Sequence, residues 1–557
     1  MTIEIRKLTN EFAVSAQLDA PALATVAAAG YRSLICNRPD GEGADQPLFS
    51  EIQDAAAISN ISVRYLPVVS GKVTDEQAVA FAKLVAELPK PILAYCRTGT
   101  RSATLWALSE SSRRPLPEIL MRARDAGIDL SGVVRRISSG GRTPTDRVDA
   151  SHQVVIIGGG AAGIAVASSL LARTPDLDVA IIDPADIHYY QPGWTLVGSG
   201  VFKPATTART MASVIPFGAH WIKAAVAAFE PEKNAVILDG CRVVHYEQLI
   251  VCPGIKLNWD GIEGLSETLG RNGVTSNYRY DLAPYTWQLT QTLARGNALF
   301  TQPPMPIKCA GAPQKALYLA CDHWRRNDRL HGIRPQFYNA GGALFGVPAY
   351  VPALMNYVER YGIDLAFNHK LTAVNGSAKQ ATFLKTNADG TTEILVRDFD
   401  MLHVVPPQIA PDFIRVSPLA DAAGWLDIDA ATLQHKKYPN IFGLGDAGNT
   451  PNAKTAAAAR KQAPVVAHNV LTNLGRHKGW ARYDGYGSCP LTVERGKIVL
   501  AEFLYGGKLA PSFPSWLING QKPSRLAWLL KERVLPPLYW RAMLKGREWM
   551  AQPELIG

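Results

Sequence analysis

Two thiols in this chain stand where local chemistry favours reactivity. Cys309 lies in the turn from Lys308 to Lys315, between an apolar run at 298–301, which predicts a strand, and a run at 316–320, which predicts a helix. A helix N-terminus and flanking cations both lower the pKa of a thiol. We therefore expect Cys309 to be a nucleophile. The alternative is an inert buried cysteine, which is common in protein cores.

Cys96 opens the second candidate loop, which follows a predicted strand at 92–95 and precedes a predicted helix at 103–109. Backbone N–H groups, Arg101 and the helix N-terminus would surround its thiolate. The loop resembles the active loop of rhodanese-type sulfurtransferases and lacks one residue that cysteine-dependent phosphatases use to wrap a phosphate. The surrounding sequence resembles a phosphatase-like domain, but the segment 66–70 holds no aspartate for a general acid. We predict a sulfur carrier, with a phosphatase and an inactive fold as alternatives.

The chain that must position these loops has 557 residues, too many for one core. We expect a phosphatase-like α/β domain at 1–137, a linker at 138–150, an oxidoreductase of two Rossmann-like lobes at 151–482 and a distinct region at 483–557. Seven cysteines show neither disulfide-framework nor zinc-site spacing. Although the net charge is +10, basic residues form no runs, so we do not expect nucleic acid as a partner.

The first Rossmann-like lobe is predicted from a buried strand at 154–157 that leads into a glycine-rich turn. In that turn Gly158 permits the tight bend, Gly160 lets a pyrophosphate approach and Gly163 allows close packing of helix on strand. A second strand ends at Asp183, where an acid binds ribose hydroxyls. FAD and NAD satisfy this pattern equally well.

A later strand decides between the two cofactors. It ends in Gly445-Asp446 and resembles the second flavin motif of the two-dinucleotide-fold oxidoreductases, while 249–254 stands where that superfamily carries a linking strand. We therefore predict FAD. Residues 303–309, where the superfamily carries a second glycine triplet, contain three prolines instead. Because the phosphates of NAD(P)H would have no such turn to bind, we expect electrons from another source.

Several longer strings are similar to the sulfide:quinone oxidoreductase family, in the class that includes the mitochondrial enzyme. The resemblance covers roughly 150–550 and is carried by the segments 188–198, 308–315, 401–407, 421–425, 454–458 and 483–491. It implies FAD, sulfide as substrate and a membrane quinone as electron acceptor. The residues expected to bind the cofactor are Gly158, Gly159, Gly160, Gly163, Asp183, Gln191, Val226, Gly254, Asp446 and Lys454.

The resemblance also implies two cysteines on one face of the flavin, and Cys309 matches the one that carries a persulfide. In the relatives nearest in pattern the second cysteine directly follows the Gly-Asp pair, whereas Ala447 and Gly448 follow it here. We therefore expect that partner to be missing. Four alternatives stay open: Cys489, Cys252 or Cys321 replaces the partner, or Cys309 works alone.

The segment 526–550 combines tryptophans, leucines and basic residues in two stretches separated by Pro536-Pro537. Such a composition is typical of helices at a membrane interface, and the alternative is an amphipathic helix packed on the flavin lobe. No signal-peptide pattern and no apolar span of about 18 residues occur. We expect a peripheral protein at the cytoplasmic face of the inner membrane, with a homo-oligomer left open.

The prediction for the whole chain is FAD-dependent oxidation of sulfide to sulfane sulfur, with electrons passed to membrane quinone. Cys96 and Arg101 would form a site that accepts the sulfur from Cys309. One alternative is a quinone-linked flavoprotein that acts on another sulfur species. The other is a sulfide sensor or scaffold that holds FAD without turnover.

Overall fold

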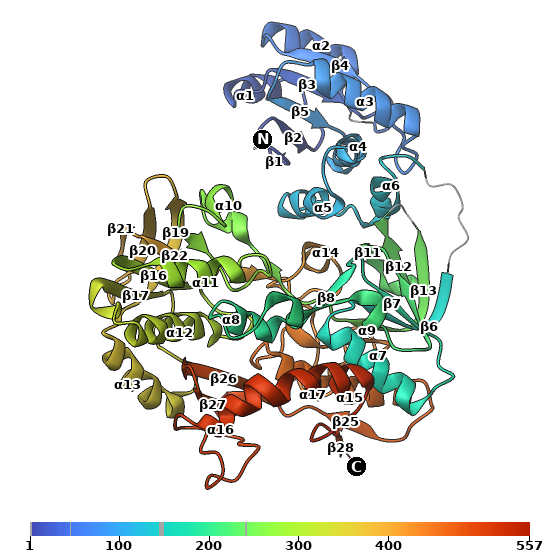
Figure 1. Cartoon of the computed structure of the whole chain (residues 1–557). Coiled ribbons are helices and arrows are strands. Elements are labelled where there is room, and N and C mark those ends of the chain that lie inside the picture. The colour runs from blue at the N-terminus through green and yellow to red at the C-terminus, as the bar shows by residue number, and fades with distance from the viewer. Residues whose placement is uncertain (1–2, 45, 144–149, 240–241, 557) are drawn as a thin grey trace. The chain divides into compact units, whose positions relative to one another are not determined.

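The computed structural model describes residues 3–44, 46–143, 150–239 and 242–556 (Figure 1). Residues 144–149 of the predicted linker at 138–150 lie outside the described residues. The chain divides into two compact units. The first comprises Met1–Ser151, Ala225–His245 and Asp412–Pro418, and the second comprises His152–Ala224, Tyr246–Pro411 and Leu419–Gly557.

The first unit is built on a five-stranded sheet of order β1-β2-β5-β3-β4, in which only β1 runs antiparallel to its neighbour. The strands are β1 (Ile5–Lys7), β2 (Phe12–Ser15), β3 (Ser33–Cys36), β4 (Ser62–Tyr65) and β5 (Ile92–Tyr95). Helices cover both faces, as a parallel sheet requires. They are α1 (Ala22–Ala28) and α2 (Phe49–Ile58) on one face, and α3 (Asp75–Glu87), α4 (Thr100–Glu110), α5 (Leu116–Asp125) and α6 (Val134–Ser138) on the other.

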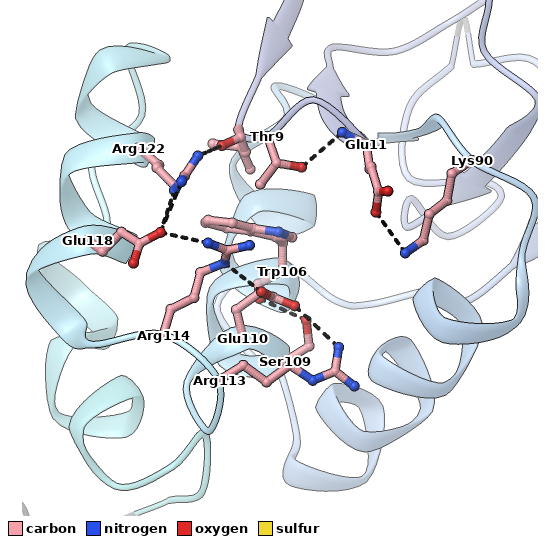
Figure 2. A network of polar contacts seen from close by, with 11 residues as sticks. Thr9, Glu11, Lys90, Trp106, Ser109, Glu110, Arg113, Arg114, Glu118 and Arg122 are labelled. Carbon is pink, nitrogen blue, oxygen red and sulfur yellow. Dashed lines mark hydrogen bonds and ion pairs between the residues drawn. The ribbon is translucent and has the colours of Figure 1, made fainter. Parts of the chain in front are cut away.

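An ion-pair network fixes α4 and α5 of this unit relative to each other. Figure 2 shows Arg114 between Glu110 and Glu118, with donor–acceptor distances of 2.7 and 2.6 Å. Arg122 bonds Glu118 as well and donates to the carbonyl of Leu8 at 3.2 Å. Because α4 follows the Cys96 loop directly, this network also steadies the helix from which that loop projects.

The second unit contains two Rossmann-like lobes, so the predicted α/β class is confirmed. In the first lobe the parallel strands run in the order β10-β7-β6-β13-β24. They are β6 (Ala150–Ile157), β7 (Val179–Ile182), β10 (Ala219–Ile222), β13 (Val243–Val251) and β24 (Ile441–Gly443), with the helices α7 (Ala161–Arg173) and α15 (Ala456–Asn473) packed on each other.

The second lobe has a parallel sheet of order β15-β22-β16-β17-β18. Its strands are β15 (Val274–Thr275), β16 (Gly296–Gln302), β17 (Ile333–Asn339), β18 (Asp364–Phe367) and β22 (Met401–His403). One face packs on α12 (Ala312–Arg326) and α13 (Val351–Tyr361). The other packs on an antiparallel sheet of β19 (His369–Asn375), β20 (Gln380–Thr386) and β21 (Thr392–Asp398).

The C-terminal region joins the same unit through a hairpin and a helical segment. The hairpin of β26 (Gly487–Glu494) and β27 (Lys497–Phe503) packs on α12. The helical segment comprises α16 (Arg525–Leu529), the π-helical turn Leu530–Val534, α17 (Leu535–Arg541) and a short turn at Met543–Lys545. Pro536 and Pro537 occupy the first turn of α17, where proline needs no hydrogen-bond partner, so they lie within a continuous helical run and do not interrupt it. Among the described residues, no helix is both long and apolar enough to span a bilayer.

Candidate functional site

The turn that carries Cys309 is tied to the rest of the second unit on both sides. The Cys309 N–H donates to the carbonyl of Lys454 at 2.8 Å, and the Cys309 carbonyl accepts the N–H of Ala312, the first residue of α12, at 2.7 Å. Cys309 has a φ of +50°, an uncommon value for a residue with a side chain. Such backbone conformations persist where the surrounding contacts hold them, as they do here.

A second thiol lies directly against Cys309. The Sγ atoms of Cys309 and Cys489 are 3.4 Å apart, and the Lys315 ammonium donates to the Cys309 Sγ at 3.0 Å. Cys489 comes from β26, and Gly311 permits its approach, because a Cβ at Gly311 would lie 2.6 Å from the Cys489 Sγ and would overlap a methyl carbon of Leu491. The site is therefore a pair of free thiols with a lysine at one of them.

The two thiols have opposite tendencies to ionise. The hydrogen bond from Cys489 and the positive charges of Lys315 and Lys531 hold the pKa of Cys309 well below its usual range, against the effect of burial. The hydrogen bond with Cys309 and burial raise the pKa of Cys489. The arrangement thus favours a thiolate at Cys309 and a protonated thiol at Cys489 that donates to it.

Of the three cysteines considered as a partner, the structure places only Cys489 at Cys309. The side chain of Cys252 packs beside the glycine turn, 3.4 Å from where a Cβ of Gly163 would lie, and burial raises its pKa. Cys321 lies in the hydrophobic core with no exposed surface, and burial raises its pKa too. Ala447, which stands where the resemblance implies a second cysteine, is fully buried. The partner is 180 residues from Cys309 in the chain, so spacing gave no signal for it.

The glycine turn after β6 has the geometry expected for a dinucleotide. Gly158 has a φ of +104°, and a Cβ there would lie 2.7 Å from the carbonyl oxygen of Cys252. A Cβ at Gly163 would overlap the carbonyl of Gly158, whereas one at Gly160 would meet nothing within 4 Å. The N-terminus of α7 therefore faces open space at Gly160, where a pyrophosphate can approach.

The acid at the end of β7 completes this turn. The Asp183 carboxylate accepts the N–H of Gly159 at 2.6 Å and the N–H of Ala185 at 2.8 Å. These two bonds fix the carboxylate beside the glycines, which is where a ribose would lie. Gly254, just beyond β13, has a φ of +84° and open space around its Cβ position. The residues of this lobe thus fit FAD.

Lys454 and Gln191 connect the predicted cofactor residues to the turn of Cys309. The Lys454 ammonium donates to the carbonyls of Asp446 and Gly448 at 2.8 and 2.7 Å, and its own carbonyl holds Cys309. Burial lowers the pKa of Lys454 to about 8 and raises that of Asp446. The Gln191 side chain accepts a hydrogen bond from the Lys308 ammonium at 2.7 Å. Val226 begins β11 (Val226–Glu230), which belongs to the first unit, and its role stays a prediction.

The Cys96 loop in the first unit follows β5, and α4 begins after it at Thr100. The Cys96 Sγ accepts the N–H of Gly99 at 3.1 Å, and Gly99 has a φ of +89°. The Arg101 guanidinium donates to the Glu42 carboxylate and to the carbonyl of Val68, both at 2.7 Å. Both Cys96 and Arg101 are buried. The loop therefore stabilises its sulfur chiefly through the backbone. Its arginine, Arg101, is paired with the carboxylate of Glu42.

Comparisons with known proteins match two parts of the chain to two different families. Residues 4–113 match the family model "Beta-lactamase hydrolase-like protein, phosphatase-like domain", and residues 152–289 match the model "Pyridine nucleotide-disulphide oxidoreductase". The mitochondrial sulfide:quinone oxidoreductase of Dictyostelium discoideum is 40% identical over 76% of this chain and 93% of its own length. The mouse enzyme of the same name is 38% identical over 71% of this chain and 87% of its own length.

A solved structure shares the fold of the second unit. The sulfide:quinone oxidoreductase of Aquifex aeolicus superposes with a TM-score of 0.59 and 19% identity, over 71% of this chain and 92% of that one. At that identity the likeness concerns the fold alone.

Proposed function

Because the chain belongs to the sulfide:quinone oxidoreductase family, we propose that it oxidises sulfide at the Cys309–Cys489 pair and passes the electrons to a quinone. The observation that carries this proposal is the contact of 3.4 Å between the two sulfur atoms. When bound, FAD would accept the two electrons that are released when the two thiols form the disulfide again, and it would pass them on to the quinone. The same family membership and the oxidoreductase match make this chain an FAD-dependent flavoenzyme.

The chain's own residues bind and activate the sulfur. When the pair is joined as a disulfide, a hydrosulfide ion that attacks the Cys309 sulfur forms a persulfide there and releases Cys489 as a thiolate. The bond between the cysteines breaks as the new sulfur–sulfur bond forms, so atoms and charge balance. The Lys315 ammonium, 3.0 Å from the Cys309 Sγ, favours negative charge on the sulfur at this position.

The proposal is tested by adding sulfide anaerobically to the purified holoprotein while its flavin absorbance is recorded, and then adding quinone. We expect bleaching with sulfide and recovery with quinone in the wild type. Cys309→Ser and Cys489→Ser should not bleach. Cys321→Ser, a buried thiol away from the pair, is the matched control and should behave as wild type. A wild type that neither bleaches nor forms a charge-transfer band would refute sulfide oxidation.

A quinone lies in the bilayer, and we propose that the C-terminal region binds the membrane surface. Leu526, Leu529 and Val534 leave 47%, 45% and 50% of their surface exposed, and Trp516 leaves 82%. Exposed basic side chains lie on the same segment, at Lys522, Arg525 and Arg533. Apolar and basic side chains together are what an interfacial segment presents to anionic lipid. Both interpretations of this segment thus find support, because its other face packs on the flavin lobes.

Co-sedimentation with vesicles of anionic phospholipid tests the membrane proposal. We expect the double variant Leu526→Glu/Leu529→Glu to lose binding and Ile394→Glu, at an exposed apolar position on β21, to keep it. Equal sedimentation of both variants and the wild type would refute a role of this surface. The cytoplasmic face of the inner membrane and a homo-oligomer stay predictions.

For the first unit we propose that Cys96 accepts sulfane sulfur. Attack of the Cys96 thiolate on the outer sulfur of a Cys309 persulfide would move that sulfur to Cys96 and leave Cys309 as a thiolate. The Gly99 N–H supports a negative sulfur at Cys96, while the pairing of Arg101 with Glu42 leaves that guanidinium less free for a phosphate. Mass spectrometry of the Cys96 peptide after turnover should show added sulfur in wild type and none in Cys309→Ser. Hydrolysis of p-nitrophenyl phosphate that depends on Cys96, with no added sulfur, would favour the phosphatase alternative.

A further inference from the structure

One basic residue of the C-terminal segment, residues 508–547, differs from the others in its exposure. Most lysines and arginines between 508 and 547 are exposed, as expected for a segment that faces water or lipid headgroups. These are Lys508, Lys522, Arg525, Arg533, Arg541, Lys545 and Arg547. Lys531 is the exception, because only 5% of its surface is exposed. A lysine is rarely buried unless its charge is compensated or used.

No acidic side chain compensates the charge of Lys531. Among the described residues its ammonium has no hydrogen-bond or ion-pair partner. The adjacent acid, Glu532, accepts the indole N–H of Trp528 at 2.9 Å and lies 3.9 Å from Arg533. The titratable groups that act on Lys531 are Lys315, Cys309 and Cys489, so its electrostatic surroundings are those of the thiol pair.

The packing of the C-terminal segment explains how Lys531 reaches this position. Lys531 lies in the π-helical turn Leu530–Val534, and π-helical turns occur frequently at functional sites. On its N-terminal side Ala527 and Trp528 pack with Leu319 of α12 and with Leu500 of β27. Leu319 is one helical turn beyond Lys315, and β27 is the hairpin partner of the strand that carries Cys489. The segment therefore packs on the helix that carries Lys315 and on the hairpin that carries Cys489.

We propose that Lys531 is a positioning residue of the thiol pair, and that the C-terminal segment completes the sulfide site by supplying it. Lys315 alone balances one negative sulfur at Cys309. Attack by hydrosulfide releases Cys489 as a thiolate, which places a second negative charge in the same buried space once the persulfide at Cys309 is ionised. A second ammonium offsets that repulsion, because unpaired charges of one sign are costly where water is excluded.

The ionisation of Lys531 is consistent with this role. Burial and the charge of Lys315 lower the pKa of Lys531 to about 7, while Cys309 and Cys489 act in the opposite direction. Arrival of a further anion raises the pKa of a neighbouring ammonium. Lys531 would thus take its full charge when anionic sulfur enters the site.

The test compares Lys531→Met with Lys531→Arg and with Lys522→Met, which removes an exposed lysine from the same segment. In each holoprotein, with the thiols reduced, the rate of Cys309 alkylation by iodoacetamide is followed from about pH 5 to about pH 10 by peptide mass spectrometry. We expect Lys531→Met to move the apparent pKa of Cys309 upward by about one unit, and to slow alkylation at about pH 6 by about tenfold. Lys531→Arg should restore the wild-type rate, and Lys522→Met should not change it.

Flavin absorbance and the melting temperature show whether each variant folds, and Lys531→Gln serves as a second neutral variant should Lys531→Met unfold. A wild-type pH profile in the folded neutral variant would overturn the proposal, and so would an equal shift in Lys522→Met. This proposal rests on the proposed function only in its account of where the second negative charge comes from. A wild type that sulfide does not bleach would refute sulfide oxidation, whereas the alkylation profile would still decide the role of Lys531.

Discussion

The turn of Cys309 and the loop of Cys96 share a local construction and stabilise sulfur by different means. Each follows a buried parallel strand and precedes a helix. At Cys96 the nearest donor is the N–H of Gly99, three residues along the chain. At Cys309 the neighbours are the side chain of Lys315 and a second thiol from a distant hairpin. The Cys96 loop, which depends on its own backbone, can hold one sulfur. The Cys309 site is assembled from several elements, so it has a second thiol with which Cys309 can form and break a disulfide.

The largest expected effect on the rate of quinone reduction follows from the loss of either thiol of the pair. We expect Cys489→Ser to reduce the rate of quinone reduction by sulfide by roughly 10³-fold or more, as Cys309→Ser should, because neither residue forms the disulfide alone. The steady-state rate, measured with equal flavin content, tests this. A Cys489→Ser protein that keeps a rate close to that of the wild type would contradict the paired-thiol mechanism.

The next effect concerns the glycine that lets the hairpin approach. Gly311→Ala places a methyl group against Leu491 and 2.6 Å from the Cys489 Sγ, so β26 must shift. We expect a loss of about 1–3 kcal/mol in the free energy of unfolding, together with slower disulfide formation. Gly346→Ala is the matched control, since a Cβ there meets nothing within 4 Å. Equal denaturation midpoints for the two variants would contradict the packing argument.

A smaller effect is expected from the lysine that contacts Cys309. Because the pKa of Cys309 is lowered in the folded protein, its thiolate persists below the usual pKa of a thiol and is lost only as the pH falls through the lowered value. Lys315→Met should move that loss to higher pH by about one unit. The pH profile of Cys309 alkylation measures the shift, with Lys522→Met as the control that removes an exposed lysine. An unchanged profile would contradict a contribution of Lys315 to the thiolate.

The smallest effect on turnover is expected in the other loop. Cys96→Ser should leave the rate of flavin bleaching by sulfide within about twofold of wild type, because its helix and strand belong to the first unit. The same variant should abolish added sulfur on the peptide that contains position 96. Stopped-flow absorbance and mass spectrometry on one preparation test both statements. A large fall in the bleaching rate would mean that the two sites are not independent.

Much of the second unit could be predicted from local patterns. The strand, glycine turn, helix and terminal acid around Gly158 and Asp183 lie within one short stretch, and each member needs the next one close by. The same holds for β24 and the Gly445-Asp446 pair that follows it. The C-terminal segment was less predictable, because its composition fits both an interfacial helix and a packed one. In the structure, one face packs and the other is exposed.

The sequence by itself determined the fold class, the FAD cofactor and the family, and it predicted Cys309 as a nucleophile, because these depend on short motifs whose members are neighbours in the chain. Only the tertiary structure decided the partner of that nucleophile. Cys489 reaches Cys309 through the packing of a hairpin on α12, and no spacing in the chain encodes that approach. Contacts of this kind depend on which surfaces pack together, a property of the whole fold.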